Sequence, residues 1–238
     1  MAVYRIADLN IDIRNKEKYT SYICKNYLAD NQLVQPDITA VSDPAEYVND
    51  KNAVPEASDG YLESLSIYRS ISNQLLDLGG FILHASVVEK DGCAFAFSAH
   101  SGTGKTTHSR IWTERFPDAR IINGDKPLVR IFDDEIYIYG TPWCGKENYN
   151  INTKSPLKAL CFIEQSQTNS ISTISKQEAV MRIYSQLLVP ADAGKLNLLL
   201  DLVGELIDRI PVYLLKCNMN SEAAEVAYRG MTEACNGR

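Results

Sequence analysis

The spacing of apolar side chains predicts two short strands at the start of the chain, followed by an irregular stretch and a helix. Residues 3–6 and 9–13 alternate between apolar and polar side chains, as strands with one buried face do. Residues 36–60 are rich in Pro, Asp, Ser and Asn, which indicates irregular loops or a flexible edge. From residue 61 to residue 78, apolar side chains recur three or four positions apart, which predicts a helix that Gly79-Gly80 ends.

A hairpin is predicted next. Residues 81–88 and 93–97 have the composition of strands, and Glu89-Lys90-Asp91-Gly92 between them is typical of a turn. If the turn is tight, strand pairing places His84 opposite Phe97. Phe97 comes just before a glycine-rich loop, so we expect His84 to lie near the mouth of that loop.

The segment after the glycine-rich loop predicts a helix, a short strand and a second hairpin. Residues 105–115 form the helix and residues 120–122 the strand. Residues 128–132 and 135–139 are the strands of the hairpin, and Asp133-Asp134 is its turn, to which we assign no chemistry.

The C-terminal third predicts further strands and helices. Residues 159–163 indicate a buried strand, and Ser175 with Glu178 forms a capping box before an apolar helical stripe. Three elements follow: a helix with a leucine stripe at 196–206 (core or subunit contact), a strand at 212–215, and a last helix from Ser221.

Length and composition favour one ordinary globular domain. The chain has 238 residues, of which 45% are apolar and 23% charged, and no linker stands out. We therefore expect a single domain over residues 1–238, with N-terminal strands and loops in 1–60 and the core in 61–238. Six cysteines are scattered without a CxxC pair, so we expect reduced cysteines and no zinc site.

Charge and hydropathy exclude two classes of partner. The formal net charge of −6 argues against a broad nucleic-acid surface, although an acidic protein can still hold a phosphate in a local pocket. No basic segment followed by an apolar run begins the chain, and no stretch approaches 18 apolar residues. We expect a cytoplasmic protein with no membrane partner.

The glycine-rich loop carries the strongest chemical signal. Small residues allow successive backbone N–H groups to point at phosphate oxygens, while Lys105 reaches the outer phosphates and the Thr106 hydroxyl binds magnesium. Ala99 stands where the general pattern has glycine, which is acceptable if Ala99 has a negative φ. The loop predicts binding of ATP with Mg²⁺ through Ser101, Gly102, Thr103, Gly104, Lys105, Thr106 and Thr107.

The residues after the loop favour a mixed sheet over a doubly wound parallel one. Asp125 follows the strand at 120–122, where a phosphate-loop protein needs a magnesium ligand. The second hairpin follows directly, without the helix-sized segment that a parallel crossover requires.

The loop and the segments on either side of it resemble a known family. Residues 101–109, Ser-Gly-Thr-Gly-Lys-Thr-Thr-His-Ser, are very like the phosphate loop of ATP-dependent phosphoenolpyruvate carboxykinase. The layout of residues 81–165 is similar to the kinase domain of HPr kinase/phosphorylase, with a histidine before the loop and an acidic motif after it. Over residues 60–232 the chain resembles small bacterial HPr-kinase-like proteins, most closely at Asp-Lys-Pro (125–127) and Gly-Thr-Pro-Trp-Cys-Gly-Lys-Glu (140–147).

The resemblance implies an α/β phosphate-loop domain of the HPr kinase/phosphoenolpyruvate carboxykinase type, with mixed sheets, antiparallel hairpins and flanking helices. It also implies phosphoryl transfer from ATP to a serine hydroxyl, with His84 supporting the loop or the acceptor side. Family members use two adjacent aspartates as metal contact and base, and this chain has Gly124 in place of the first. Asp125 then serves alone, or Glu147 or Glu63 replaces the missing carboxylate, or catalysis is weak or absent. Glu63 itself is predicted on the solvated face of its helix.

We therefore expect an ATP-dependent serine kinase whose catalytic residues are His84, Lys105, Asp125 and Glu147, with Thr106 and Asp125 at the magnesium. The acceptor is a serine-containing peptide, small protein or metabolite. The alternative is a catalytically weak or inactive module that senses nucleotide or binds peptide, and a third reading is an assembly protein with a structural loop. The acceptor, the phosphate donor and the oligomeric state stay open, a homo-oligomer among them.

Overall fold

The computed structural model describes residues 2–233, without the side chain of the last of these. The chain divides between Gly79 and Gly80 into two compact units. The sequence placed its internal subdivision at residue 60, but helix α3 (Asp59–Leu75) packs on strand β3 (Ile38–Val41), so this helix belongs to the first unit. The single domain over residues 1–238 stays a prediction.

The first unit is a small sheet with helices. Strands β1 (Ala2–Ile6) and β2 (Leu9–Arg14) pair antiparallel, as the alternating pattern predicts, and β3 pairs parallel with β2. Two helical segments lie between β2 and β3, and two helices follow β3: α1 (Lys18–Ile23), η1 (Lys25–Tyr27), α2 (Pro44–Ala53) and α3.

The prediction of irregular loops at 36–60 is wrong, because this segment holds β3 and α2. The Asp and Pro residues that resemble a loop start α2: the Asp43 side chain accepts a hydrogen bond from the backbone N–H of Ala45, and Pro44 is the first helical residue. No side chain of α2 is buried, so the helix has no apolar stripe to reveal it.

Helix α3 confirms the predicted helix and changes the role of Glu63. Ser58 caps its start, and the 3₁₀ segment η2 (Leu76–Leu78) ends at Gly79, which has a φ of 71°. Glu63 is buried, not solvated as expected, and its two carboxylate oxygens accept the backbone N–H groups of Lys16 and Glu17 at 2.7 and 2.8 Å. Both oxygens thus have a structural task within the first unit.

The second unit is built on a nine-stranded mixed sheet, and the long strand β10 (Lys154–Gln165) joins its two parts. The start of β10 pairs antiparallel with β9, whereas its later residues pair parallel with β6 on one side and β12 on the other. The other strands are β4 (Gly80–Ile82), β5 (Ser86–Lys90), β6 (Cys93–Ser98), β7 (Arg120–Asn123), β8 (Leu128–Ile131), β9 (Ile136–Tyr139), β11 (Ser170–Thr173) and β12 (Val212–Cys217). Parallel and antiparallel strands with flanking helices confirm the predicted fold class.

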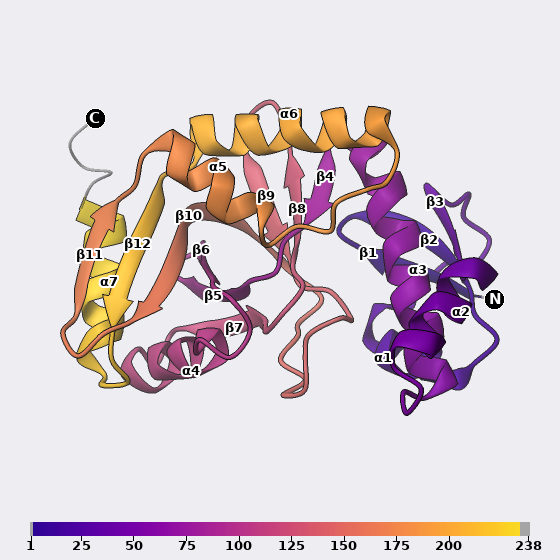
Figure 1. The fold of residues 1–238 in the computed structure, drawn as a ribbon, viewed down its shortest axis with the longest axis horizontal. Helices are drawn as coiled ribbons and strands as arrows, with labels where there is room; N and C mark the ends of the chain where they lie inside the picture. Colours follow the sequence, from indigo (N-terminus) through magenta and orange to yellow (C-terminus); the bar gives the residue numbers. More distant parts are fainter. Residues whose placement is uncertain (1, 234–238) are drawn as a thin grey trace. The chain divides into compact units, whose positions relative to one another are not determined.

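Four helices flank this sheet: α4 (Lys105–Arg115), α5 (Lys176–Tyr184), α6 (Ala193–Arg209) and α7 (Glu222–Glu233). Figure 1 shows α6 lying along the side of β4, β8 and β9, and α4 lying beside β5 and β7. The core between α4, α7 and the sheet is aromatic and apolar, with Trp112 fully buried against Phe95 and Phe97.

The predicted strand over residues 81–88 is instead two strands, β4 and β5. Between them, the backbone N–H groups of Leu83, His84 and Ala85 donate to the carbonyls of Pro127, Gln186 and Asp125. These partners lie far along the chain, so no local pattern announces the break.

The hairpin register also differs from the prediction. Asp91 and Gly92 alone form the turn, with φ of 52° and 74°, so Ser86 and not His84 faces Phe97. His84 still lies close to the loop, because its carbonyl oxygen accepts a hydrogen bond from Ser98 Oγ at 2.7 Å.

The predicted elements of the C-terminal third are confirmed, and one strand was missed. Ser175 Oγ accepts the backbone N–H of Glu178 at the start of α5. The missed strand is β11, which has one apolar residue among four and pairs with β12.

Two expectations from composition concern cysteines and membranes. Five of the six cysteines lie in the described part of the chain and all five are free thiols, while Cys235 lies outside it. No helix within residues 2–233 combines the length and the apolar character that a bilayer crossing requires.

Candidate functional site

The predicted phosphate loop connects the end of β6 with the start of α4. Gly102 and Gly104 have φ of 80° and 118°, conformations that a residue with a side chain rarely adopts. A Cβ atom built on either glycine meets nothing within 4 Å, so backbone conformation and not lack of space requires glycine. Ala99 does not have a positive φ, which satisfies the condition for its presence here.

The glycines of the loop lie directly before the N-terminus of α4. Gly104 is the residue before the helix and Lys105 is its first residue. The first N–H groups of a helix have no partner within it, and the helix dipole is positive at this end. The loop therefore has the backbone geometry of an anion-binding turn.

Lys105 lies under the loop. Its Nζ donates a hydrogen bond to the carbonyl oxygen of Ala99 at 2.9 Å, and its side chain is buried. Burial lowers the pKa of Lys105, the charge of Asp125 acts in the opposite direction, and the charge of Lys126 adds to the lowering. The Lys105 ammonium has two further N–H donors with which it can bind a phosphate oxygen.

Asp125 is held between His84 and Lys126. His84 Nε2 lies 3.0 Å from Asp125 Oδ1, and Lys126 Nζ lies 2.7 Å from Asp125 Oδ2. Burial would raise the pKa of Asp125, but the hydrogen bond from His84 and the charge of Lys126 outweigh it and lower the pKa to about 2. Asp125 is thus a carboxylate at any physiological pH, and each of its oxygens already has a neighbouring nitrogen donor.

His84 is oriented by two acceptors. Its Nδ1 lies 3.1 Å from Gln186 Oε1, while Nε2 faces Asp125. Gln186 also accepts the His84 backbone N–H through its own carbonyl, and its Nε2 donates to Ser185 Oγ at 3.0 Å. The two contacts fix the orientation of the His84 ring between Gln186 and Asp125.

Asn123 positions Asp125, and the sequence interpretation missed it. Asn123 is fully buried, and its Oδ1 accepts the backbone N–H groups of Asp125 and Lys126 at 2.9 and 2.8 Å. Its Nδ2 donates to the Thr141 carbonyl at 3.0 Å. An Asn two residues before an Asp, with Gly between them, is the signature of an Asx turn and was the signal that could have identified it.

Gly124 leaves no room for a side chain. A Cβ atom built there would lie 2.8 Å from the backbone oxygen of Cys144 and 3.4 Å from Tyr149 Cβ. Its N–H donates to the Tyr149 carbonyl at 2.9 Å. The segment around residues 144–149 therefore occupies the space that an aspartate at position 124 would need.

Glu147 belongs to the segment around residues 144–149 and lies near Asp125. A Cβ atom built on Gly145 would lie 3.2 Å from Asp125 Cβ and 3.8 Å from Glu147 Oε2, so both acidic side chains border one point. Both charges act on Cys144: burial raises the pKa of its thiol, and the charges of Asp125 and Glu147 raise that pKa further. The structure thus brings together His84, Asp125 and Glu147, with the charge of Asp125 acting on Lys105.

The residues present fit a magnesium ion that is bound mainly through phosphates. Within the described chain, no group of three or more His, Cys, Asp or Glu side chains is placed to hold a metal. Magnesium often uses only one or two protein ligands together with phosphate oxygens and water. The carboxylate of Asp125 and the hydroxyl of Thr106 are a donor set of this kind.

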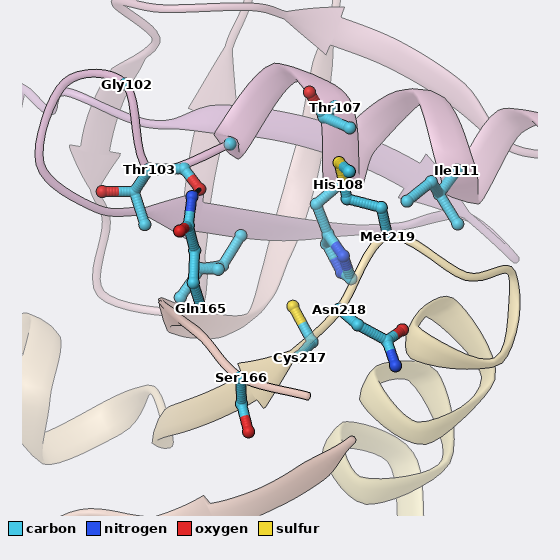
Figure 2. Close-up of a pocket in the computed structure, with 12 residues that line it drawn as sticks. Gly102, Thr103, Thr107, His108, Ile111, Gln165, Ser166, Cys217, Asn218 and Met219 are labelled. Carbon is cyan, nitrogen blue, oxygen red and sulfur yellow. Dashed lines mark hydrogen bonds between the residues drawn. The ribbon is translucent and has the colours of Figure 1, made fainter. Parts of the chain in front are cut away.

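Two cavities flank the loop. The α4-side cavity, about 380 Å³, is bounded by the loop at Gly102–Gly104, by α4, and by the ends of β10 and β12 (Figure 2). The α5-side cavity, about 530 Å³, is bounded by residues 99–103, the end of β10, and Arg182, Ser185 and Gln186. Gln186 connects the α5-side cavity to His84 and hence to Asp125.

Comparison with known proteins finds similarity among solved structures and none among family models or curated sequences. No protein-family model and no curated protein sequence matches the chain. Among solved structures, the Hpr(Ser) kinase/phosphatase from Coxiella burnetii is similar with a TM-score of 0.40 and 8% sequence identity, over 65% of this chain and 93% of that chain. This similarity is distant and at the level of the fold, and no role of any residue follows from it.

Proposed function

We propose that this protein binds a nucleoside triphosphate with magnesium and transfers its terminal phosphoryl group to a hydroxyl acceptor. One observation carries the proposal: a strand, a loop with two glycines at positive φ, and a helix hold a buried lysine whose charge interacts with the carboxylate of a His–Asp–Lys cluster. Phosphoryl transfer needs positioned phosphates, positive charge and one base more than it needs covalent chemistry. The resemblance to HPr-kinase-like proteins supports the same function. We propose that the protein acts in the cytoplasm.

Each residue of the cluster has a role that follows from its contacts. The loop backbone and Lys105 would bind the phosphate oxygens, and the Lys105 ammonium would neutralise charge that develops on the leaving group. Asp125 and Thr106 would hold the magnesium ion, which supplies further positive charge at the phosphates. His84 would orient Asp125, since it contacts that carboxylate directly.

Glu147 is the better candidate for the base. Asp125 has a pKa lowered to about 2 and a nitrogen donor at each oxygen, so it accepts a proton poorly. Glu147 is exposed, and like Asp125 it lies within 4 Å of the position that a Cβ atom on Gly145 would take. In the proposed step the acceptor oxygen forms a bond to the terminal phosphorus, the bond to the leaving diphosphate breaks, and Glu147 takes the hydroxyl proton.

The α5-side cavity would admit the acceptor. It reaches from the loop to Gln186, which contacts His84. A serine-containing peptide, protein or metabolite fits the proposal, because a primary hydroxyl is small enough to approach between the loop and the cluster.

The binding half of the proposal is tested with Lys105→Met, which keeps an apolar stem of similar length and removes the charge. We expect the affinity for Mg·ATP in calorimetric titration to fall at least about tenfold. Lys176→Met is the matched control, because Lys176 is an exposed lysine paired with Asp208 on the surface. Unchanged binding by Lys105→Met would contradict the phosphate-loop assignment.

A nucleotide sensor without turnover is the second candidate, and the packing around Gly124 favours it. That packing excludes the first aspartate that related kinases use as a base. The two candidates differ in ADP release, measured with the native protein and with Glu147→Gln. If the protein is a kinase with Glu147 as base, the native protein releases ADP, and the rate of ADP release by Glu147→Gln is roughly a hundredfold lower at unchanged Mg·ATP affinity. A sensor binds Mg·ATP and releases no ADP in either form.

A further inference from the structure

The α4-side cavity has apolar walls and a histidine ring between them. Ile111 of α4 and Ile163 of β10 form part of the walls, and Met219 lies at the rim with 79% of its surface exposed. Figure 2 shows the His108 ring pointing from α4 into the space between Gln165 and Cys217. A flat apolar group of limited size would find walls on several sides.

His108 contributes a flat, neutral ring to the wall of this cavity. The indole N–H of Trp112 donates to His108 Nε2 at 3.0 Å, so the ring proton of the neutral histidine is on Nδ1. Burial lowers the pKa of His108 to about 3, and the ring is therefore neutral at pH 7. His108 is 3% exposed and its Nδ1 has almost no accessible surface, so the ring adds to the apolar wall and offers no hydrogen bond to the cavity.

The orientation of a bound triphosphate follows from Lys105. In a phosphate loop the lysine reaches the β- and γ-phosphates, whereas the backbone holds the α- and β-phosphates. Lys105 Nζ lies at the carbonyl of Ala99, a residue that lines the α5-side cavity and not the α4-side cavity. The terminal phosphate therefore lies toward the α5 side, and the α-phosphate with its nucleoside lies toward the α4 side.

We propose that the α4-side cavity binds the purine base of the triphosphate, with the base packed between the apolar walls beside the His108 ring. This inference rests on the proposed function, because it assigns the nucleoside end of the same ligand. The cavity of about 380 Å³ is at the lower end of the range for small-molecule sites and accommodates one nucleoside. A purine covers more of the apolar walls than a pyrimidine does, so base size contributes to selection.

The test compares Mg²⁺ complexes of ATP, CTP and inorganic tripolyphosphate in calorimetric titrations of the full chain. We expect ATP to bind at least about tenfold more tightly than tripolyphosphate, with CTP between them. Ser166→Trp fills the cavity from its rim, since Ser166 lines it and is partly exposed. This variant should bind ATP as weakly as tripolyphosphate and keep the native affinity for tripolyphosphate. Thr168→Trp, on the same connection but outside the cavity, should behave like the native protein.

Each outcome separates the base pocket from the phosphate loop. Equal binding of the three ligands by the native protein, or unchanged ATP binding by Ser166→Trp, overturns the base pocket and leaves the loop assignment intact. Failure of all three ligands, tripolyphosphate included, overturns the proposed function itself. Retained tripolyphosphate binding by Ser166→Trp also shows that the variant is folded.

Discussion

At the scale of single residues, the environment of Asp125 decides what this carboxylate does. A carboxylate with His84 at one oxygen, Lys126 at the other and a pKa of about 2 is suited to hold charge and unsuited to take protons. A divalent ion that binds here shares the carboxylate oxygens with Lys126 and His84. Metal binding therefore uses the same atoms as the contacts of Asp125 with these two side chains.

Asp125→Asn tests the metal assignment. The amide keeps the size of the side chain and still accepts a hydrogen bond, but it binds magnesium poorly. We expect the variant to lose much more affinity for Mg·ATP than for ATP in the presence of a chelator, as measured in parallel titrations. Equal losses in the two titrations would show that Asp125 is not part of the metal site.

The same variant has a pH-dependent effect on stability. A carboxyl whose pKa falls from 3.8 to about 2 on folding stabilises the folded state above about pH 4, and this contribution disappears as the pH falls toward 2. Asp125→Asn should therefore lower the free energy of unfolding by roughly 2 kcal/mol at pH 6 and by clearly less at pH 3, in urea titrations. Asp133→Asn, in the exposed hairpin turn, is the control. A loss of the same size at both pH values would contradict the ion-pair account.

Gly124→Asp is expected to destabilise the protein and not to restore a base. Gly124 does not have a positive φ, so the backbone conformation would accept an aspartate, but the added Cβ would lie 2.8 Å from a backbone oxygen. Overpacking of this kind costs about 1–3 kcal/mol, and Gly124→Ala should lose a similar amount in a thermal melt because bulk and not charge causes it. A native melting temperature for either variant would show that residues 144–149 move aside easily.

Residue-level prediction from sequence is possible where the chemistry is local. The phosphate loop, which stays a prediction, was proposed because glycines, lysine and threonine are contiguous between a strand and a helix. His84 and Asp125 were chosen separately, and the structure brings them into contact. Gln186 carried no signal, because it is 102 residues from His84 and its neighbours Ser185 and Leu187 show no motif.

At the scale of elements, boundaries set by local signals were predicted well. Helix α4 has the predicted bounds, since Gly104 precedes it and Phe116-Pro117 follows it. The strand at 81–88 was predicted as continuous because every side chain fits a strand, and the break comes from backbone bonds to distant carbonyls. Strand β11 was missed because it is short and largely exposed, so it lacks the apolar pattern of a buried strand.

Two glycines in different elements should respond oppositely to alanine. Gly104→Ala places a side chain at a φ of 118°, which should cost about 1–3 kcal/mol and weaken Mg·ATP binding. Gly204 lies inside α6, and a Cβ atom there meets nothing within 4 Å. Gly204→Ala should therefore stabilise the protein by about 0.5–1 kcal/mol. Urea unfolding of both variants checks the two signs, and a neutral Gly104→Ala would show that the loop conformation does not depend on glycine.

At the scale of the whole molecule, the proposed site belongs to one of the two compact units. All the residues assigned to phosphate, metal, base and proton transfer lie within residues 80–238, the second unit. The sequence anticipated a nucleotide-binding core and a separate N-terminal part. It misplaced the boundary, because the helix at 59–75 packs on a strand hidden in a Pro- and Asp-rich segment.

A fragment of residues 80–238 should therefore retain Mg·ATP binding. If it shows a cooperative melt, we expect its affinity to lie within about threefold of the full chain, since no proposed ligand contact is removed. A fragment of residues 1–79 is the control and should not bind. A folded 80–238 fragment without affinity would show that the first unit contributes directly to the site.

The position of the loop between two cavities has a kinetic consequence. Under the proposed function, a donor that enters on the α4 side and an acceptor that enters on the α5 side would not obstruct each other, so either could arrive first. The phosphoryl group would then pass directly between two bound molecules, and initial-rate plots should intersect as in a ternary-complex mechanism. Because the two entrances share little beyond the loop, changes to one wall can alter the choice of acceptor while the choice of donor stays the same.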